Sequence, residues 1–126
     1  MKTKKRTVSA TEIARILKGY RYNFGTEIAL QDGIERVLKE NGIGHRREVR
    51  LGDAGIIDFM VERIGVEVKI KGSPSAVGRQ VLDYLGRPEL DEIVVVTSRA
   101  LSASYLRVPE LAGKKVTVVD LWTQNF

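Results

Sequence analysis

Apolar residues follow a helical spacing in two segments near the N-terminus. After a capping box formed by Ser9 and Glu12, they recur every three or four positions. A second stripe begins after Thr26, a suitable N-cap, and ends before Gly42, a suitable stop. The pattern therefore predicts two successive helices, over residues 9–20 and 26–41.

The hydrophobic period then changes to that of strands. Predicted strands cover residues 45–51, 56–62, 66–70, 92–98 and 115–121. Ser73 and Pro74 are typical of a helix start, and that helix is predicted to end near Leu85. Residues 99–114 are predicted to be partly helical, with the helix broken before Pro109. This order of elements predicts an α/β fold with a central mixed sheet flanked by helices.

The chain length of 126 residues indicates a single domain. The sequence shows no internal repeat. A basic arm and an extra helix occupy residues 1–24, a core residues 26–98, and a C-terminal helix and strand residues 99–126. No apolar run approaches the ~20 residues of a membrane span, and no apolar stretch follows the basic N-terminus as in a secretory signal. The absence of cysteine excludes disulfides and thiolate chemistry, so a reducing cytoplasm is the expected location.

The formal net charge of +5 favours a polyanionic partner, because clustered lysine and arginine release counterions from phosphate backbones. DNA is the partner that we expect. The candidate DNA contacts from this charge pattern are Lys4, Lys5, Arg6, Arg46 and Arg47. A solvated basic surface is the alternative for each of them.

Residues 55–70 predict a hairpin in which one register separates apolar from charged side chains. With a tip at Arg63 and Ile64, the opposed apolar pairs are Val61 with Val66, Phe59 with Val68, and Ile57 with Ile70. On the other side of the sheet, the opposed pairs are Asp58 with Lys69 and Met60 with Glu67. The pattern therefore gathers two acids and an amine on one face.

Two neighbouring carboxylates resist joint ionisation, and a divalent cation would remove that conflict. Mg²⁺ prefers hard oxygen ligands, which Asp58, Glu67 and the Val68 carbonyl could supply, and Mn²⁺ is expected to substitute. Lys69 could orient or deprotonate an attacking water, which suits phosphodiester hydrolysis. The alternative is a surface ion-pair cluster of little energetic weight.

Asp58 followed by Glu67-Val68-Lys69 resembles the signature of the PD-(D/E)XK nucleases, the superfamily of type II restriction enzymes and archaeal Holliday junction resolvases. The resemblance extends over residues 26–98, although Ile57 replaces the proline of the motif. It implies a restriction-endonuclease-like fold, in which Asp58 and Glu67 bind metal and Lys69 is catalytic.

Members of that superfamily often add an acid from the first core helix, and Glu27 is the candidate here. Gln31 lies one turn later on the same inward stripe as a possible second contact. Gln80 and Tyr84 match a Q-x-x-x-Y element of some branches, which implies that Gln80 lies near the acids or Lys69. The alternatives are a first-turn acid for Glu27, backbone satisfaction for Gln31, and packing for Gln80 and Tyr84.

Lys71 and Ser73 could meet a phosphate at the start of the helix that begins at Pro74, or could be a solvated lysine and a plain cap. His45 is the only histidine, and a local structural role is expected for it.

We therefore expect a Mg²⁺-dependent DNA endonuclease of prokaryotic or phage origin that acts as a homodimer. Ile13, Ile16, Leu17 and residues 120–126 are the candidate interface. The alternatives are a branched-DNA resolvase of the same fold, an inactive nucleic-acid-binding relative, and a protein with an incidental charge cluster.

Overall fold

The computed structural model describes residues 7–23, 25–97, 110, 111 and 113–121. Its helices are α1 (Ala10–Lys18), α2 (Glu27–Glu40), the short 3₁₀ helix η1 (Gly52–Ala54) and α3 (Pro74–Leu85). Its strands are β1 (Arg46–Arg50), β2 (Ile56–Val61), β3 (Ile64–Lys69), β4 (Glu92–Thr97), β5 (Glu110–Leu111) and β6 (Lys114–Asp120). The predicted α/β class is confirmed.

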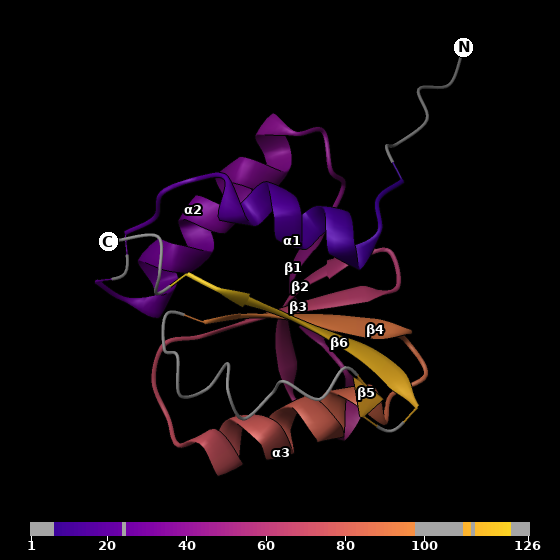
Figure 1. Ribbon diagram of the computed structural model, residues 1–126. Coiled ribbons are helices and arrows are strands. Elements are labelled where there is room, and N and C mark those ends of the chain that lie inside the picture. Colours follow the sequence, from indigo (N-terminus) through magenta and orange to yellow (C-terminus); the bar gives the residue numbers. More distant parts are fainter. Residues whose placement is uncertain (1–6, 24, 98–109, 112, 122–126) are drawn as a thin grey trace.

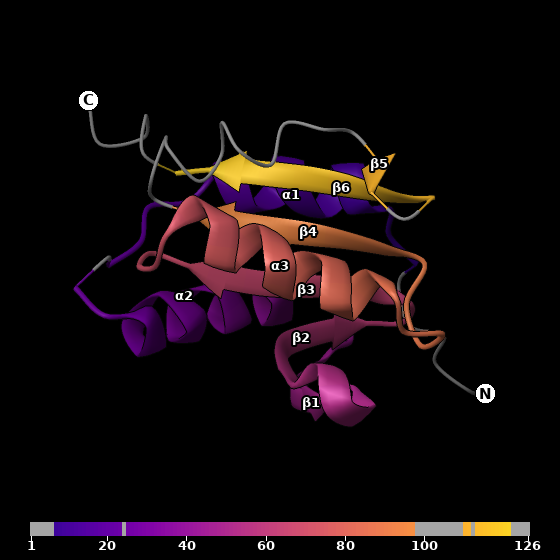
Figure 2. The same cartoon turned by 90° about the horizontal axis from the view of Figure 1, so that it is seen from below.

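The strands form one mixed sheet in the order β1-β2-β3-β4-β6-β5. The pairs β1–β2, β2–β3 and β5–β6 are antiparallel, whereas β3–β4 and β4–β6 are parallel. Helices α1 and α2 cover one face of this sheet and α3 covers the other (Figures 1 and 2). Helix α3 connects the parallel strands β3 and β4, as such a crossover requires.

Each face of the sheet has its own hydrophobic core. Helices α1 and α2 pack on the sheet through residues such as Leu17, Leu30 and Ile34, while α3 packs through Val81 and Leu85. Strand β4 alternates between the two cores, so its β-branched run is buried on both sides, as the sequence predicts.

The three predicted N-caps are confirmed. The hydroxyls of Ser9, Thr26 and Ser73 accept hydrogen bonds from the backbone N–H groups at the third helical position. Ser73 therefore caps α3.

The expected hairpin register is wrong by two residues. The turn consists of Glu62 and Arg63, so that Val61 opposes Ile64 and Phe59 opposes Val66. Glu62 adopts a φ of 52°, and Arg63 is fixed at the turn by hydrogen bonds to Asp91 and to the Pro88 carbonyl. A shift of two keeps each β3 residue on its expected face, but it places Glu67 rather than Lys69 opposite Asp58.

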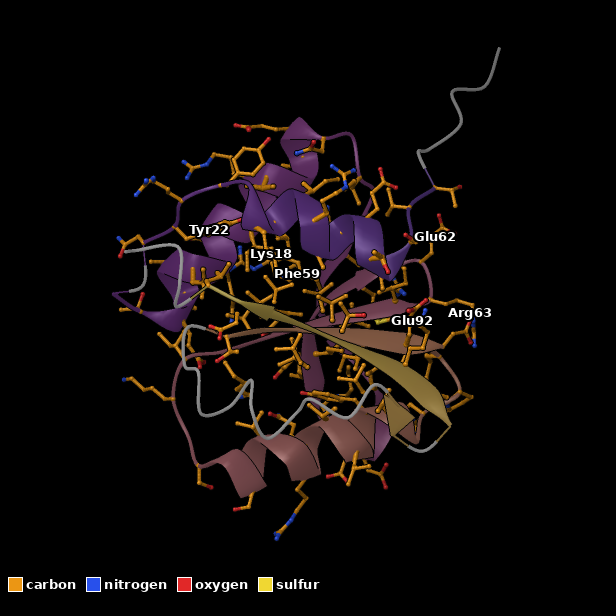
Figure 3. All side chains as sticks on the ribbon, in the orientation of Figure 1. Lys18, Tyr22, Phe59, Glu62, Arg63 and Glu92 are labelled. Atoms are coloured by element: carbon orange, nitrogen blue, oxygen red, sulfur yellow. The ribbon has the colours of Figure 1, made fainter. Side chains whose placement is uncertain are left out.

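The expected placement of Ile57 on the same face of the sheet as Phe59 is also wrong. Near Asp58, the regular alternation of side chains between the two faces is interrupted in both β1 and β2, so Ile57 and Phe59 face opposite sides. Arg47 lies over the Phe59 ring on the α1–α2 face, whereas the next pair, Val49 and Ile57, packs on the α3 face. Glu48, between Arg47 and Val49, has a φ of 56°, in the left-handed region. Figure 3 shows Phe59 between the sheet and the overlying helices.

The candidate dimer interface on α1 is wrong. Ile13, Ile16 and Leu17 are buried in the core of their own chain, which leaves them no surface to offer to a partner. Of residues 120–126, those from 122 onward lie outside the described residues, as do Lys4, Lys5, Arg6 and the predicted helix within residues 99–108. Across the described part of the chain, no helix combines the length and hydrophobicity needed to span a membrane.

Gly65 tests the packing between β3 and the α3 face. A Cβ at this position would lie 2.5 Å from Cδ1 of Ile57 and 3.1 Å from Cδ1 of Leu90. We expect Gly65→Ala to lower the free energy of unfolding by about 1–3 kcal/mol, measured by urea denaturation. The control is Gly86→Ala, where a Cβ meets nothing closer than 3.5 Å, and equal effects of the two changes would contradict this packing.

Candidate active site

The two predicted acids meet where β2 and β3 stop pairing. The paired residues end at Phe59 and Val66, and beyond them side chains take over the hydrogen bonds. The Asp58 N–H donates to Oε1 of Glu67 at 3.2 Å, and the Val68 N–H donates to Oδ2 of Asp58 at 2.7 Å. Asp58 and Glu67 thus hold the two strands together across this point.

The Val68 carbonyl is directed toward the same place. In a strand, the N–H and C=O of one residue point to the same neighbour, and the Val68 N–H points to Asp58. Its oxygen is therefore a third hard donor on the β2 side of β3, as the sequence suggests.

Lys69 lies beside the pair of acids. Its Nζ is 3.5 Å from Oε2 of Glu67, and its side chain is 24% exposed while that of Glu67 is 3% exposed. The ammonium group of Lys69 therefore lies between a buried carboxylate and the solvent.

Burial and mutual repulsion dominate the electrostatics of these acids. Burial first, and the charge of Asp58 second, raise the pKa of Glu67 to about 8, against the opposing effect of Lys69. Burial also raises the pKa of Asp58, although the Val68 N–H opposes it. Near neutral pH, this pair retains a proton that two solvated carboxylates would have lost.

Helix α2 supplies two polar contacts from the predicted inward stripe. Nε2 of Gln31 donates to Oδ1 of Asp58 at 3.1 Å, so Gln31 touches the site. Oε2 of Glu27 accepts the Ile70 N–H at 3.1 Å, just beyond the end of β3. Glu27 approaches the acids from the expected side, but its carboxylate is engaged by the backbone.

Helix α3 reaches the site through Tyr84. Its buried hydroxyl donates to the Ile56 carbonyl at 2.8 Å and accepts from Nε2 of Gln80 at 3.0 Å. Burial, followed by the charges of Glu67 and Asp58, raises the pKa of Tyr84. Gln80 is therefore linked through Tyr84 to the backbone of β2 at Ile56, two residues before Asp58. Among the described residues, no hydrogen bond joins Gln80 directly to Asp58 or Glu67.

The predicted DNA contacts divide into exposed and engaged groups. Arg46 and Lys71 are exposed, and Ser73 caps α3. Arg47 instead donates to Asp32, Glu35 and Gln31 on α2. The expected structural role of His45 agrees with its contacts to Glu35 and the Ile43 carbonyl.

The donor set suits a hard divalent cation. Asp58, Glu67 and the Val68 carbonyl supply oxygens only, and the two acids repel each other without a positive charge between them. Within the described residues, no three His, Cys, Asp or Glu side chains gather as a metal-binding group, so Glu27 does not complete one here.

Sequence reasoning missed the contacts of Arg47 and the backbone hydrogen bonds of Asp58 and Glu67. Both sets of contacts depend on the actual strand register and on the break in side-chain alternation at Glu48. Neither feature produces a local pattern in the sequence.

Comparison with protein-family models, with curated proteins and with solved structures finds no match to this chain. The resemblance to the PD-(D/E)XK nucleases therefore stays a prediction carried by the residues of the site.

The raised pKa of Glu67 predicts how stability depends on pH. The folded protein keeps this proton up to about pH 8, whereas the unfolded chain loses it near the ordinary carboxyl pKa, so stability falls as pH rises between these values. Glu67→Gln removes this dependence. Without metal, we expect the variant to be more stable than the wild type at pH 9 by on the order of 2 kcal/mol, and to lose this advantage near pH 4, measured by urea denaturation. A difference that is constant with pH would contradict the assignment.

A divalent cation should stabilise the fold through the same acids. At a tenfold excess over Kd, ligand binding adds about 1.4 kcal/mol, which appears as a higher Tm. We expect Mg²⁺ to raise the Tm of the wild type relative to EDTA, and Asp58→Asn to abolish this rise. An equal rise in both proteins would place the cation elsewhere.

Proposed function

We propose that this protein is a metal-dependent DNA endonuclease that hydrolyses phosphodiester bonds by a PD-(D/E)XK mechanism. The observation that carries the proposal is the meeting of Asp58, Glu67 and Lys69 at one partly buried point between β2 and β3. Three separately predicted groups converge there, with the Val68 carbonyl beside them.

In this proposal, Asp58, Glu67 and the Val68 carbonyl hold Mg²⁺. When bound, the ion would supply positive charge to the reacting phosphate and make the attacking water more acidic. Lys69 holds a proton at Nζ, orients the attacking water by hydrogen bonding and stabilises negative charge that develops on the phosphate oxygens. The buried setting strengthens each of these interactions.

DNA is proposed as the substrate because the chain carries a net charge of +5 and exposes Arg46 and Lys71. Cleavage of both strands of a duplex would require two such sites, so we also propose that a homodimer acts. Its interface would not include the buried face of α1.

The first test is cleavage of supercoiled, linear and four-way-junction DNA in Mg²⁺, Mn²⁺ or EDTA. We expect metal-dependent nicking by the wild type and a loss of at least 10²-fold in Asp58→Asn and Lys69→Met, because each removes a contact made to the metal or the transition state. Asp83→Asn, an exposed acid on α3, is the matched control and should cut normally.

The outcomes separate this proposal from its rivals. DNA binding in EDTA without cleavage in any metal would indicate a binding protein and overturn the proposal. Normal cutting by Asp58→Asn would do the same for the site. A strong preference for the junction over linear duplex would identify a resolvase among enzymes of this mechanism.

A further inference from the structure

A chain of hydrogen bonds lies behind Asp58, on the side of α2. Nε2 of Gln31 donates to Oδ1 of Asp58 at 3.1 Å, while Oε1 of the same amide accepts from Nη2 of Arg47 at 3.2 Å. Gln31 is only 8% exposed. A buried amide therefore bridges a guanidinium group and the first predicted metal ligand.

Arg47 fixes which way this amide points. An arginine offers only donors and an ionised carboxylate only acceptors, so both partners of Gln31 require the same orientation of its amide. Without Arg47, the amide loses the partner of its oxygen and is free to turn that oxygen toward Asp58. The carboxylate would then face an acceptor in place of a donor.

The guanidinium group of Arg47 is itself held in place. Its Nη1 donates to Oδ1 of Asp32 at 2.8 Å and to Oε1 of Glu35 at 3.0 Å. Its central carbon lies 5.6 Å from the centre of the Phe59 ring. These contacts commit donors of Arg47 to its own chain, which argues against the predicted role as a DNA contact.

The Asp58 carboxylate consequently accepts hydrogen bonds from two elements, β3 and α2. Oδ2 accepts the Val68 N–H of β3 and Oδ1 accepts the Gln31 amide of α2. Two donors on different oxygens fix both the position and the plane of the carboxylate. Each carboxylate oxygen accepts only one of these hydrogen bonds, so each keeps a lone pair for a cation.

We propose that Gln31 and Arg47 are positioning residues, which hold Asp58 in the orientation that binds the divalent cation. This inference rests on the proposed function. Arg47 would act only through Gln31 and would touch neither metal nor DNA.

The test is Mn²⁺ affinity without DNA, measured from the electron paramagnetic resonance signal of free Mn²⁺. We expect Gln31→Leu and Arg47→Lys each to weaken binding by at least tenfold, a typical cost of losing a group that orients a metal ligand. Arg47→Lys keeps the charge but cannot reproduce the planar set of donors. The control is Arg36→Lys, a change of an exposed arginine on α2, the helix that carries Gln31. The Mn²⁺ affinity of this variant should stay within twofold of that of the wild type.

Two further measurements separate positioning from folding and from DNA contact. Thermal unfolding in EDTA shows whether each variant folds, and Arg47→Lys is the milder change should Gln31→Leu fail. The double variant should bind Mn²⁺ about as tightly as the single variant with the lower Mn²⁺ affinity. The reason is that Arg47 acts on Asp58 only through Gln31, so the two losses do not add. DNA affinity in EDTA should be unchanged in Arg47→Lys.

Failure of this inference can be distinguished from failure of the proposed function. If the wild type binds Mn²⁺ in an Asp58-dependent way while folded Gln31 and Arg47 variants bind it equally well, only the positioning role is overturned. If Arg47→Lys loses DNA affinity alone, Arg47 is a DNA contact and the inference is also overturned. If the wild type binds no Mn²⁺, both proposals fall.

Discussion

The site depends on one constraint, which is that the Asp58 and Glu67 carboxylates replace the backbone pairing between β2 and β3. The Glu67 carboxylate accepts the Asp58 N–H, and the Asp58 carboxylate accepts the Val68 N–H. This satisfies buried polar groups, but it also brings two acids together in a poorly solvated place. The same contacts thus hold the strands together and create the need for positive charge.

The two faces of the sheet contribute to this point in different ways. Helix α2 acts on the Asp58 carboxylate through Gln31, whereas α3 acts on the β2 backbone through the Tyr84 hydroxyl and the Ile56 carbonyl. Both hydrophobic cores therefore position the acids. A carboxylate that is held from rigid elements on both sides would already be oriented for a cation, which is compatible with the proposed nuclease function.

The sequence was sufficient for the elements and for the two faces of β3. It placed Asp58 on the face of Glu67, whereas the structure has Asp58 in contact with Gln31 of α2, the helix on the other face. The period of α2 placed Gln31 inward, and the alternation along β3 separated Glu67 and Lys69 from the valines. It was insufficient for the hairpin register, which depends on Glu62 accepting a left-handed φ and on Arg63 binding Asp91. It was also insufficient for the contacts of Arg47 and for the face on which Ile57 lies. A strict period of two cannot anticipate the break in side-chain alternation at Glu48, which has a left-handed φ.

The most direct test of a cation between Asp58 and Glu67 is the anomalous difference density of a crystal soaked in Mn²⁺. The account predicts a peak within about 2.0–2.3 Å of an oxygen of each carboxylate, and near the Val68 carbonyl. The absence of a peak between the two carboxylates at saturating Mn²⁺ would contradict it.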